Sequence, residues 1–297
     1  MKKFAFFLTL FIILAFMAGC SSTSVPAQIA ATTLPVYEFT GRICEGTGLS
    51  VTRLVTEEVS CLHDYSLNVR QVKAAEAAET IVISGAGLEE FLDDILLNAD
   101  ILDASASIEL ICPEDDHEHE HEPEHEHEGH HHAQDPHIWL SPENAKVMAL
   151  NICAGLTERY PEYTDAFSTN LSGLISDLDT LQTYGEEALN SLGHREIITF
   201  HDGFAYFAQA YGLTILEAVE EESGSEASAK ELIHLIEEVE HHGLSAIFTE
   251  KNGSTSAASV ISRETGAELF SLDMAMAGDS YFDAMYHNID TIKEALK

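Results

Sequence analysis

The chain has 297 residues with 14 basic and 51 acidic side chains, so its formal net charge is −37. An acidic surface of this kind argues against nucleic acids and anionic ligands as partners and is compatible with cations. The hydrophobic share of 45% is that of a globular chain. Because its length exceeds what one compact core usually organises, we expect two domains.

The amino terminus has the composition of an export signal. Two lysines open the chain, an apolar stretch runs through residues 4–16, and small residues lead to Cys20. The stretch is shorter than the roughly 20 apolar residues that span a membrane. It resembles a bacterial lipoprotein signal, which implies a signal peptide over 1–20, lipidation of Cys20 and a small polar tether over 21–28. The mature protein is therefore expected outside the cytoplasm, lipid-anchored to the cell membrane.

Short β-rich runs alternate with helical ones in the first half of the chain. The expected strands are 28–34, 50–55 and 80–84, and the expected helices are 36–44, 66–78 and 88–97. This is the βαβ rhythm of a parallel sheet. We therefore assign residues 29–160 to an N-terminal α/β lobe.

A His/Glu-rich loop over residues 114–132 interrupts that lobe. It holds half of the sixteen histidines, namely His117, His119, His121, His125, His127, His130, His131 and His132. Neutral imidazole is the commonest protein ligand for zinc and related cations, and interleaved carboxylates attract cations. A merely solvated acidic loop would need carboxylates but no imidazoles. We expect these histidines to form an auxiliary, weak metal-binding segment, with the tight site elsewhere.

The same loop satisfies the letters of the HExxH pattern of zinc metalloproteases, at His117–His121 and at His121–His125. That pattern works only on a helix, where histidines four residues apart share a face. Pro123 would break such a helix, and strict alternation of His and Glu produces the match by chance. The protein is therefore not expected to be an enzyme.

The second half of the chain begins with helices and then repeats the α/β rhythm. After a helix over 142–159, apolar residues recur at spacings of three and four between 163 and 192, which predicts one long connecting helix within 161–193. Residues 194–297 form the C-terminal α/β lobe, in which we expect strands at 196–200, 213–218, 246–249 and 268–272 and helices at 203–211, 228–241, 256–265 and 281–296. The fold class is α/β, with two lobes of mainly parallel sheet joined by one long rigid helix.

Four cysteines remain once Cys20 carries lipid, and they are Cys44, Cys61, Cys112 and Cys153. An even number in an oxidising compartment predicts two disulfides, whose pairing the sequence leaves open among three arrangements. Because Cys61 lies two residues before a histidine, thiolate ligation of a metal is the alternative for that residue.

Three histidines outside the His/Glu-rich loop stand where an expected strand or helix meets a loop. His63 follows the second strand, His137 directly precedes a helix, and His201 follows the strand at 196–200. Open α/β sheets place their ligands at such strand ends. Asp273 has the same position after the last strand. Singly each is more often structural, a helix cap in the case of Asp273, but the shared position favours one common site.

Four segments carry a family resemblance: His63-Asp64-Tyr65, Asp135-Pro136-His137-Ile138-Trp139-Leu140, Phe200-His201-Asp202-Gly203-Phe204-Ala205-Tyr206-Phe207 and Gly278-Asp279-Ser280-Tyr281-Phe282. They resemble the solute-binding lipoproteins of zinc and manganese ABC transporters, the cluster A-I family. The resemblance implies a monomer in which two lobes clamp one metal ion through His63, His137, His201 and Asp273. It also implies delivery to a membrane permease coupled to an ATPase. Members of this family have been called adhesins, so a surface adhesin or zinc store is the alternative class.

The ligand set favours zinc over manganese. Three imidazoles and one carboxylate suit tetrahedral Zn2+, whereas Mn2+ prefers more oxygen. In the family, a histidine at position 201 and a His-rich loop are zinc features. Copper and nickel would also bind such a set, and either Asp273 or water could be the fourth ligand. Because ligation needs neutral imidazole, affinity is expected to fall below about pH 6.5.

Overall fold

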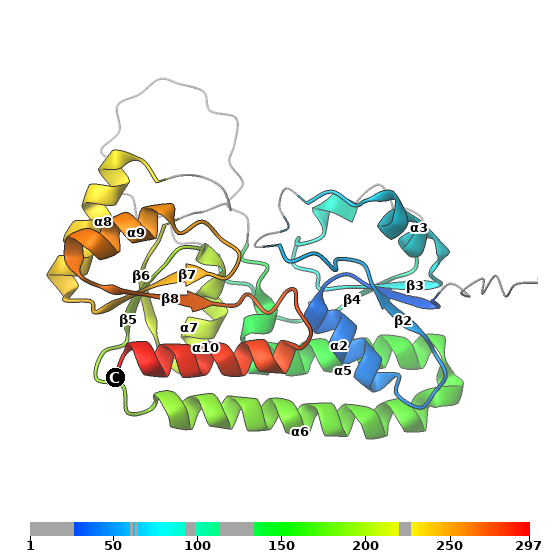
Figure 1. Cartoon of the computed structure of the whole chain (residues 1–297). Coiled ribbons are helices and arrows are strands. Elements are labelled where there is room, and N and C mark those ends of the chain that lie inside the picture. Colours follow the sequence, from blue (N-terminus) through cyan, green and yellow to red (C-terminus); the bar gives the residue numbers. More distant parts are fainter. Residues whose placement is uncertain (1–26, 60–61, 63–64, 93–98, 113–133, 220–226) are drawn as a thin grey trace, which may run out of the picture.

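The structure, a computed structural model, describes residues 27–59, 62, 65–92, 99–112, 134–219 and 227–297. The expected signal peptide with Cys20, residues 21–26 of the tether, Cys61, His63 and the His/Glu-rich loop lie outside these described residues. Two four-stranded sheets stand side by side, each with helices on both faces (Figure 1). The expected two-lobed α/β fold is confirmed.

The first sheet has the strand order β2-β1-β3-β4 and is parallel throughout. Its strands are β1 (Ile29–Ala31), β2 (Val51–Arg53), β3 (Thr80–Ile83) and β4 (Ile101–Asp103). The first three confirm expected strands. The sequence analysis missed β4, because three residues, of which only Leu102 is buried, are too short for a periodic signal.

The two helices of this lobe begin differently, because one has a side-chain cap and the other has only a proline in its first turn. Two helices, α2 (Leu34–Ile43) and α3 (Val69–Ala77), match expectation, and Asn68 and Gln71 form a capping box at the start of α3. The helix expected over 88–97 is seen only as a 3-10 turn at Glu90–Leu92, and residues 93–98 lie outside the description.

The second sheet has the order β6-β5-β7-β8, so it repeats the strand order of the first sheet. Its strands are β5 (Glu196–Thr199), β6 (Thr214–Ala218), β7 (Ala246–Glu250) and β8 (Glu268–Leu272), all in parallel pairs. The helices of this lobe are α7 (Ala205–Tyr211), α8 (Ala229–His242) and α9 (Ser256–Thr265), and the 3-10 turn η4 (Asp202–Phe204) precedes α7. All four strands and these three helices were expected.

Three helices lie on the lower side of the molecule in Figure 1. They are α5 (Pro142–Arg159), α6 (Thr164–Leu189) and α10 (Tyr281–Ala295), with short 3-10 turns at η2 (Ile138–Leu140) and η3 (Pro161–Tyr163). Figure 1 shows α6 running along the lower edge from one lobe to the other. Its 26 residues span about 39 Å at the usual helical rise, and an apolar stripe that includes Phe167, Leu174, Leu178 and Leu181 is buried. The expected connecting helix is present.

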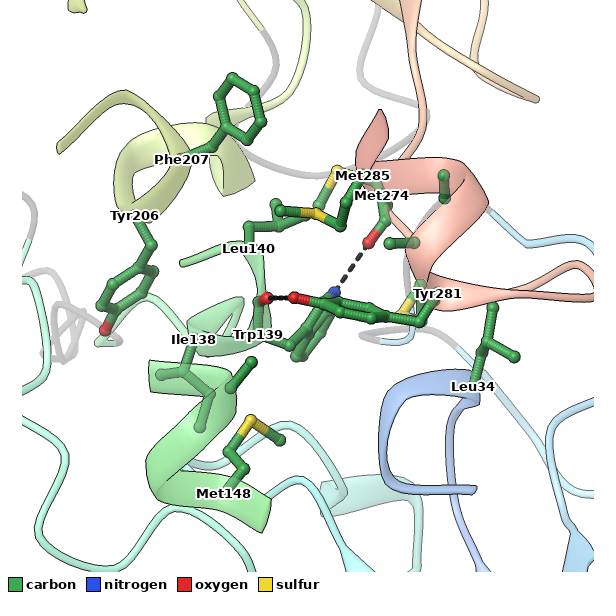
Figure 2. Packing of buried hydrophobic residues seen from close by; sticks show 14 of the residues in the cluster. Leu34, Ile138, Trp139, Leu140, Met148, Tyr206, Phe207, Met274, Tyr281 and Met285 are labelled. Carbon is green, nitrogen blue, oxygen red and sulfur yellow. Dashed lines mark hydrogen bonds between the residues drawn. The ribbon is translucent and has the colours of Figure 1, made fainter. Parts of the chain in front are cut away.

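One hydrophobic core joins the lobes around Trp139, which is fully buried (Figure 2). The Trp139 indole donates to the Met274 carbonyl at 2.7 Å, and the Tyr281 hydroxyl donates to the Trp139 carbonyl at 2.8 Å. The Leu34 N–H also donates to the Met276 carbonyl at 3.1 Å. The lobes are therefore held by shared packing and hydrogen bonds as well as by α6.

Three described cysteines, Cys44, Cys112 and Cys153, are free, and Cys44 and Cys153 are buried in the core. The expected two disulfides are therefore wrong for these three residues. Burial raises the pKa of the Cys44 thiol to about 12, and nearby Cys153 acts in the same direction. Both thiols pack as small apolar groups.

Within the part of the chain that the structure describes, no helix has the length and apolar character needed to cross a membrane.

Candidate metal centre

His201 follows the carboxyl end of β5, and its backbone is still extended. It occupies the position directly before the turn η4. In this sheet β5 stands between β6 and β7, so it is the strand at which the chain order reverses. Ligands of open α/β sheets bind in the crevice outside such strand ends. The side chain is only 1% exposed. The strand-end prediction for His201 agrees with this position.

His137 lies between the Asp135-Pro136 dipeptide and the turn η2, and is also 1% exposed. Asp135 Oδ1 accepts from the His137 N–H at 2.9 Å and lies 2.8 Å from the ring nitrogen Nδ1. One carboxylate oxygen thus holds both the backbone and the ring. This contact directs the other ring nitrogen, Nε2, away from Asp135.

The two histidines meet across the lobes with their Nε2 atoms 3.4 Å apart. Their rings are close to perpendicular, with an interplanar angle of 82°. Zinc binds histidine nitrogen at about 2.0–2.1 Å, and two nitrogens on one tetrahedral ion are then about 3.3–3.4 Å apart. The separation therefore equals one edge of a tetrahedral zinc site.

Gly203 makes room for this pair. A Cβ atom at this position would lie 2.8 Å from His137 Nδ1, 2.8 Å from His201 Cδ2 and 2.5 Å from Met274 Cε. Each distance is far below an ordinary carbon contact, so any larger residue would push the rings out of place. The glycine in the His201-Asp202-Gly203 segment is thus required by close approach rather than by the backbone angles.

Each histidine has a buried carboxylate facing its Nδ1 atom. For His137 it is Asp135, and for His201 it is Glu250 at the end of β7, with Oε2 at 3.9 Å from Nδ1. Carboxylates in this position set the tautomer and orientation of metal-binding imidazoles. The sequence analysis assigned no role to either residue. Glu250 could have been found, because it directly follows the strand expected at 246–249 and so lies at the same edge of the sheet as His201.

Tyr206 fixes the segment that carries His137. Its hydroxyl accepts from the Ile111 N–H at 2.9 Å and donates to the Asp135 carbonyl at 3.0 Å. The Asp135 N–H in turn donates to the Ile111 carbonyl at 2.9 Å. Ile111 and Asp135, which lie on either side of the His/Glu-rich loop in the sequence, are therefore held together, and Asp135 is two residues before His137.

Asp273 lies directly after β8, and both of its carboxylate oxygens are occupied. Oδ1 accepts from the Ala275 N–H at 2.9 Å, and Oδ2 accepts from the Lys251 ammonium at 2.9 Å. Buried Asn288 holds its backbone through two hydrogen bonds of 2.7 Å. The hydrogen bond with Asp273 is the first cause of a raised pKa at Lys251.

The structure thus brings His137 and His201 together but pairs Asp273 with a lysine. Within the described ranges no set of three or more His, Cys, Asp or Glu side chains is close enough to hold a metal ion. His63, the remaining expected ligand, lies outside those ranges.

Comparisons with known proteins show which family this chain resembles. The family model for the periplasmic zinc-uptake complex component A, ZnuA, matches residues 29–295. The zinc-binding lipoprotein AdcA of Streptococcus pneumoniae (strain ATCC BAA-255 / R6) is 28% identical over 293 residues, covering 94% of this chain. Among solved structures, a crystal structure of ZnuA is 29% identical with a TM-score of 0.79, covering 91% of this chain and all of that chain. The Zn(II)-bound ZnuA-like domain of Streptococcus pneumoniae AdcA is 25% identical with a TM-score of 0.73, covering 90% and 98% respectively.

The match covers only part of the AdcA lipoprotein. This chain spans 58% of the length of that lipoprotein.

Proposed function

The chain belongs to the ZnuA family, the periplasmic zinc-uptake components of metal ABC transporters, and on this premise we propose that it captures Zn2+ between its lobes for delivery to a membrane permease. The observation that carries the proposal is the pair of buried imidazoles, His137 and His201, whose Nε2 atoms are 3.4 Å apart. Neutral imidazoles at this separation fit a tetrahedral zinc ion.

We infer that the complete ligand set is His63, His137, His201 and Asp273. Glu58 and Val59, which lead toward His63, line the same hollow as Glu250 and Asp273. This position of Glu58 and Val59 supports a ligand role for His63, which follows Val59 by four residues in the sequence. Histidine at position 201 supplies nitrogen rather than oxygen, which favours Zn2+ over Mn2+.

The His/Glu-rich loop is proposed to gather zinc weakly and to pass it to the tight site. The hydrogen bonds of Asp135 with Ile111 and Tyr206 support this role, because they fix the chain between the loop and His137, two residues before that histidine. The relatives and solved structures described above are named as binding or uptake proteins, not as metalloproteases.

The first experiment tests the two described imidazoles. Metal-free protein is titrated with zinc against a competing chelator, and the H201A and H137A variants are compared with the parent. We expect each variant to lose at least about a hundredfold in zinc affinity, because a tetrahedral site then lacks one of its ligands. His194, which is exposed outside the site, provides the control variant H194A, whose affinity is expected to match the parent.

A loop deletion distinguishes the tight zinc site from the weak sites of the His/Glu-rich loop. Deleting residues 114–132 is expected to leave one tightly bound zinc and to remove only weaker ones. Loss of the tight zinc after this deletion, with H201A unchanged, would place the true ligands in the loop and contradict the proposal.

We propose further that the protein is exported, that Cys20 carries the lipid anchor, and that it acts as a monomer. In this proposal residues 29–160 and 194–297 are the lobes and 161–193 the connecting segment. The two separate sheets and the single long helix α6 support that division.

A further inference from the structure

Lys251 is the first residue after β7, and its position places a positive charge inside the proposed zinc site. Its N–H donates to the Leu272 carbonyl at 2.8 Å, which fixes the backbone beside the end of β8. Its ammonium then reaches Asp273 Oδ2 at 2.9 Å. The Asp273 side chain is 14% exposed, whereas the Lys251 side chain is 49% exposed.

This ion pair lies between two hollows of the surface. One is lined by Glu58, Glu250 and Met274. The other has a volume of about 290 Å³ and is lined by Asp279, Asp283 and His287. Lys251 and Asp273 line both hollows. The lysine therefore stands between the acidic hollow and the hollow that Glu250 lines.

A metal ion bound at Asp273 Oδ2 would lie close to the Lys251 ammonium, which is 2.9 Å from that oxygen, and the two positive charges would repel each other. The other oxygen, Oδ1, accepts from the Ala275 backbone, which is fixed. The Lys251 ammonium is free to move, because half of its side chain lies in solvent and two other carboxylates, Glu58 and Asp279, are near enough to attract it. Displacing the lysine is thus the step that would open Asp273 to a cation.

We propose that Lys251 occupies Asp273 as a cationic placeholder that the incoming Zn2+ must displace, so that this lysine weakens zinc binding and sets its affinity. The inference rests on the proposed zinc-binding function. Two effects act together: the ion pair is lost on binding, and the displaced charge still repels the dication from nearby. Both effects disappear when the ammonium is removed.

The test compares zinc affinities of the full chain by competition with a chelator. K251M, which keeps the aliphatic stem, is expected to bind zinc about tenfold more tightly than the parent, and K251Q should shift the affinity the same way. K251R, which keeps the charge, should stay near the parent. The matched control is K230M, since Lys230 is an exposed lysine near the start of α8 that lines neither hollow.

The effect of Lys251 on zinc affinity is expected to act through Asp273. A double-mutant cycle that combines K251M with D273N tests this coupling. In a D273N background, K251M is expected to change zinc affinity by less than about twofold. A second readout is thermal unfolding: adding zinc should raise the midpoint of K251M more than that of the parent, because ligand stabilisation grows with affinity.

The possible failures are distinguishable. A parent protein that binds no zinc would overturn the proposed function. A parent that binds zinc, together with K251M and K251Q of equal or weaker affinity, would overturn only the placeholder role of Lys251.

Discussion

Glu89 is a carboxylate that this chain buries in the first lobe, with only 4% of the residue exposed. Its Oε1 accepts from the Thr32 hydroxyl and the Ser84 N–H, each at 2.7 Å, and its Oε2 accepts from the Gly85 N–H at 3.0 Å. Burial raises its pKa to about 7, against the opposing effect of these hydrogen bonds. The side chain joins the loops that follow β1 and β3.

A raised folded-state pKa makes the contribution of Glu89 depend on pH. Between the ordinary value of 4.5 and about 7, the folded protein binds the proton more tightly than the unfolded chain. Its contribution to stability is therefore fully present below pH 4.5 and is lost as pH rises to about 7. The full loss is of the order of 3 kcal/mol in the free energy of unfolding.

Urea unfolding from pH 4.5 to 8 of the parent and of E89Q, which stays neutral, measures this loss. We expect the stability of the parent relative to E89Q to fall as pH rises through this window. E90Q, at the exposed neighbouring position, controls for removing one acid. Parallel pH profiles of the parent and E89Q would show that Glu89 keeps an ordinary pKa.

At the scale of elements, α6 carries two glycines in different surroundings. Gly185 is buried, and a Cβ there would lie 2.2 Å from Cε1 of Tyr211 in α7. The Tyr211 ring cannot easily retreat, because it is 5% exposed and packs edge-on against Phe207 at 4.8 Å. Gly173 is exposed, with nothing within 4 Å of such a Cβ. The close approach of α6 to the second lobe therefore depends on Gly185.

The two glycines give a matched pair of variants. G173A is expected to raise the free energy of unfolding by up to about 1 kcal/mol, since alanine favours the helix. G185A gains the same helix preference, but overpacking costs about 1–3 kcal/mol, so we expect a net loss of stability. Urea unfolding of both variants and of the parent measures these changes in the free energy of unfolding. A shift of the same sign and size in both would mean that Tyr211 moves aside without cost.

Sequence periodicity predicted some helices and strands well and missed others. The stripe of Phe167, Leu174 and Leu181 identified α6 within a few residues, because helical spacing over seven turns is a local and redundant signal. The strand β4, at Ile101–Asp103, has no such redundancy. The helix expected from residue 88 gives only a short turn in the described part, where the Glu89 side chain bonds back to the preceding loop.

At the scale of the molecule, the lobes share one core around Trp139, the single tryptophan of the chain. The Tyr281 hydroxyl and the Met274 carbonyl bond this residue from the second half of the chain (Figure 2). Removing one lobe would expose the packing surface of the other. The two lobes are therefore expected to unfold together.

Trp139 fluorescence reports the seam between the lobes and circular dichroism reports helices everywhere, so their unfolding transitions in urea should coincide. Y281F leaves the Trp139 carbonyl without its donor and should lower the unfolding free energy by about 1–3 kcal/mol, with the transition still single. Y37F, at a residue 36% exposed, is the control and should change little. Two separated transitions in the parent would contradict a shared core.

The sequence by itself determined the alternation of strands and helices, the connecting helix, and histidines at strand ends, because each is a pattern along neighbouring residues. Only the tertiary structure decided that His137 and His201 meet across the lobes, that Glu250 faces one of them and that Lys251 holds Asp273. It also left Cys44 and Cys153 as free thiols in the core. The contact between His137 and His201 joins residues 64 positions apart, and all of these contacts depend on how whole elements pack. No local pattern records that packing.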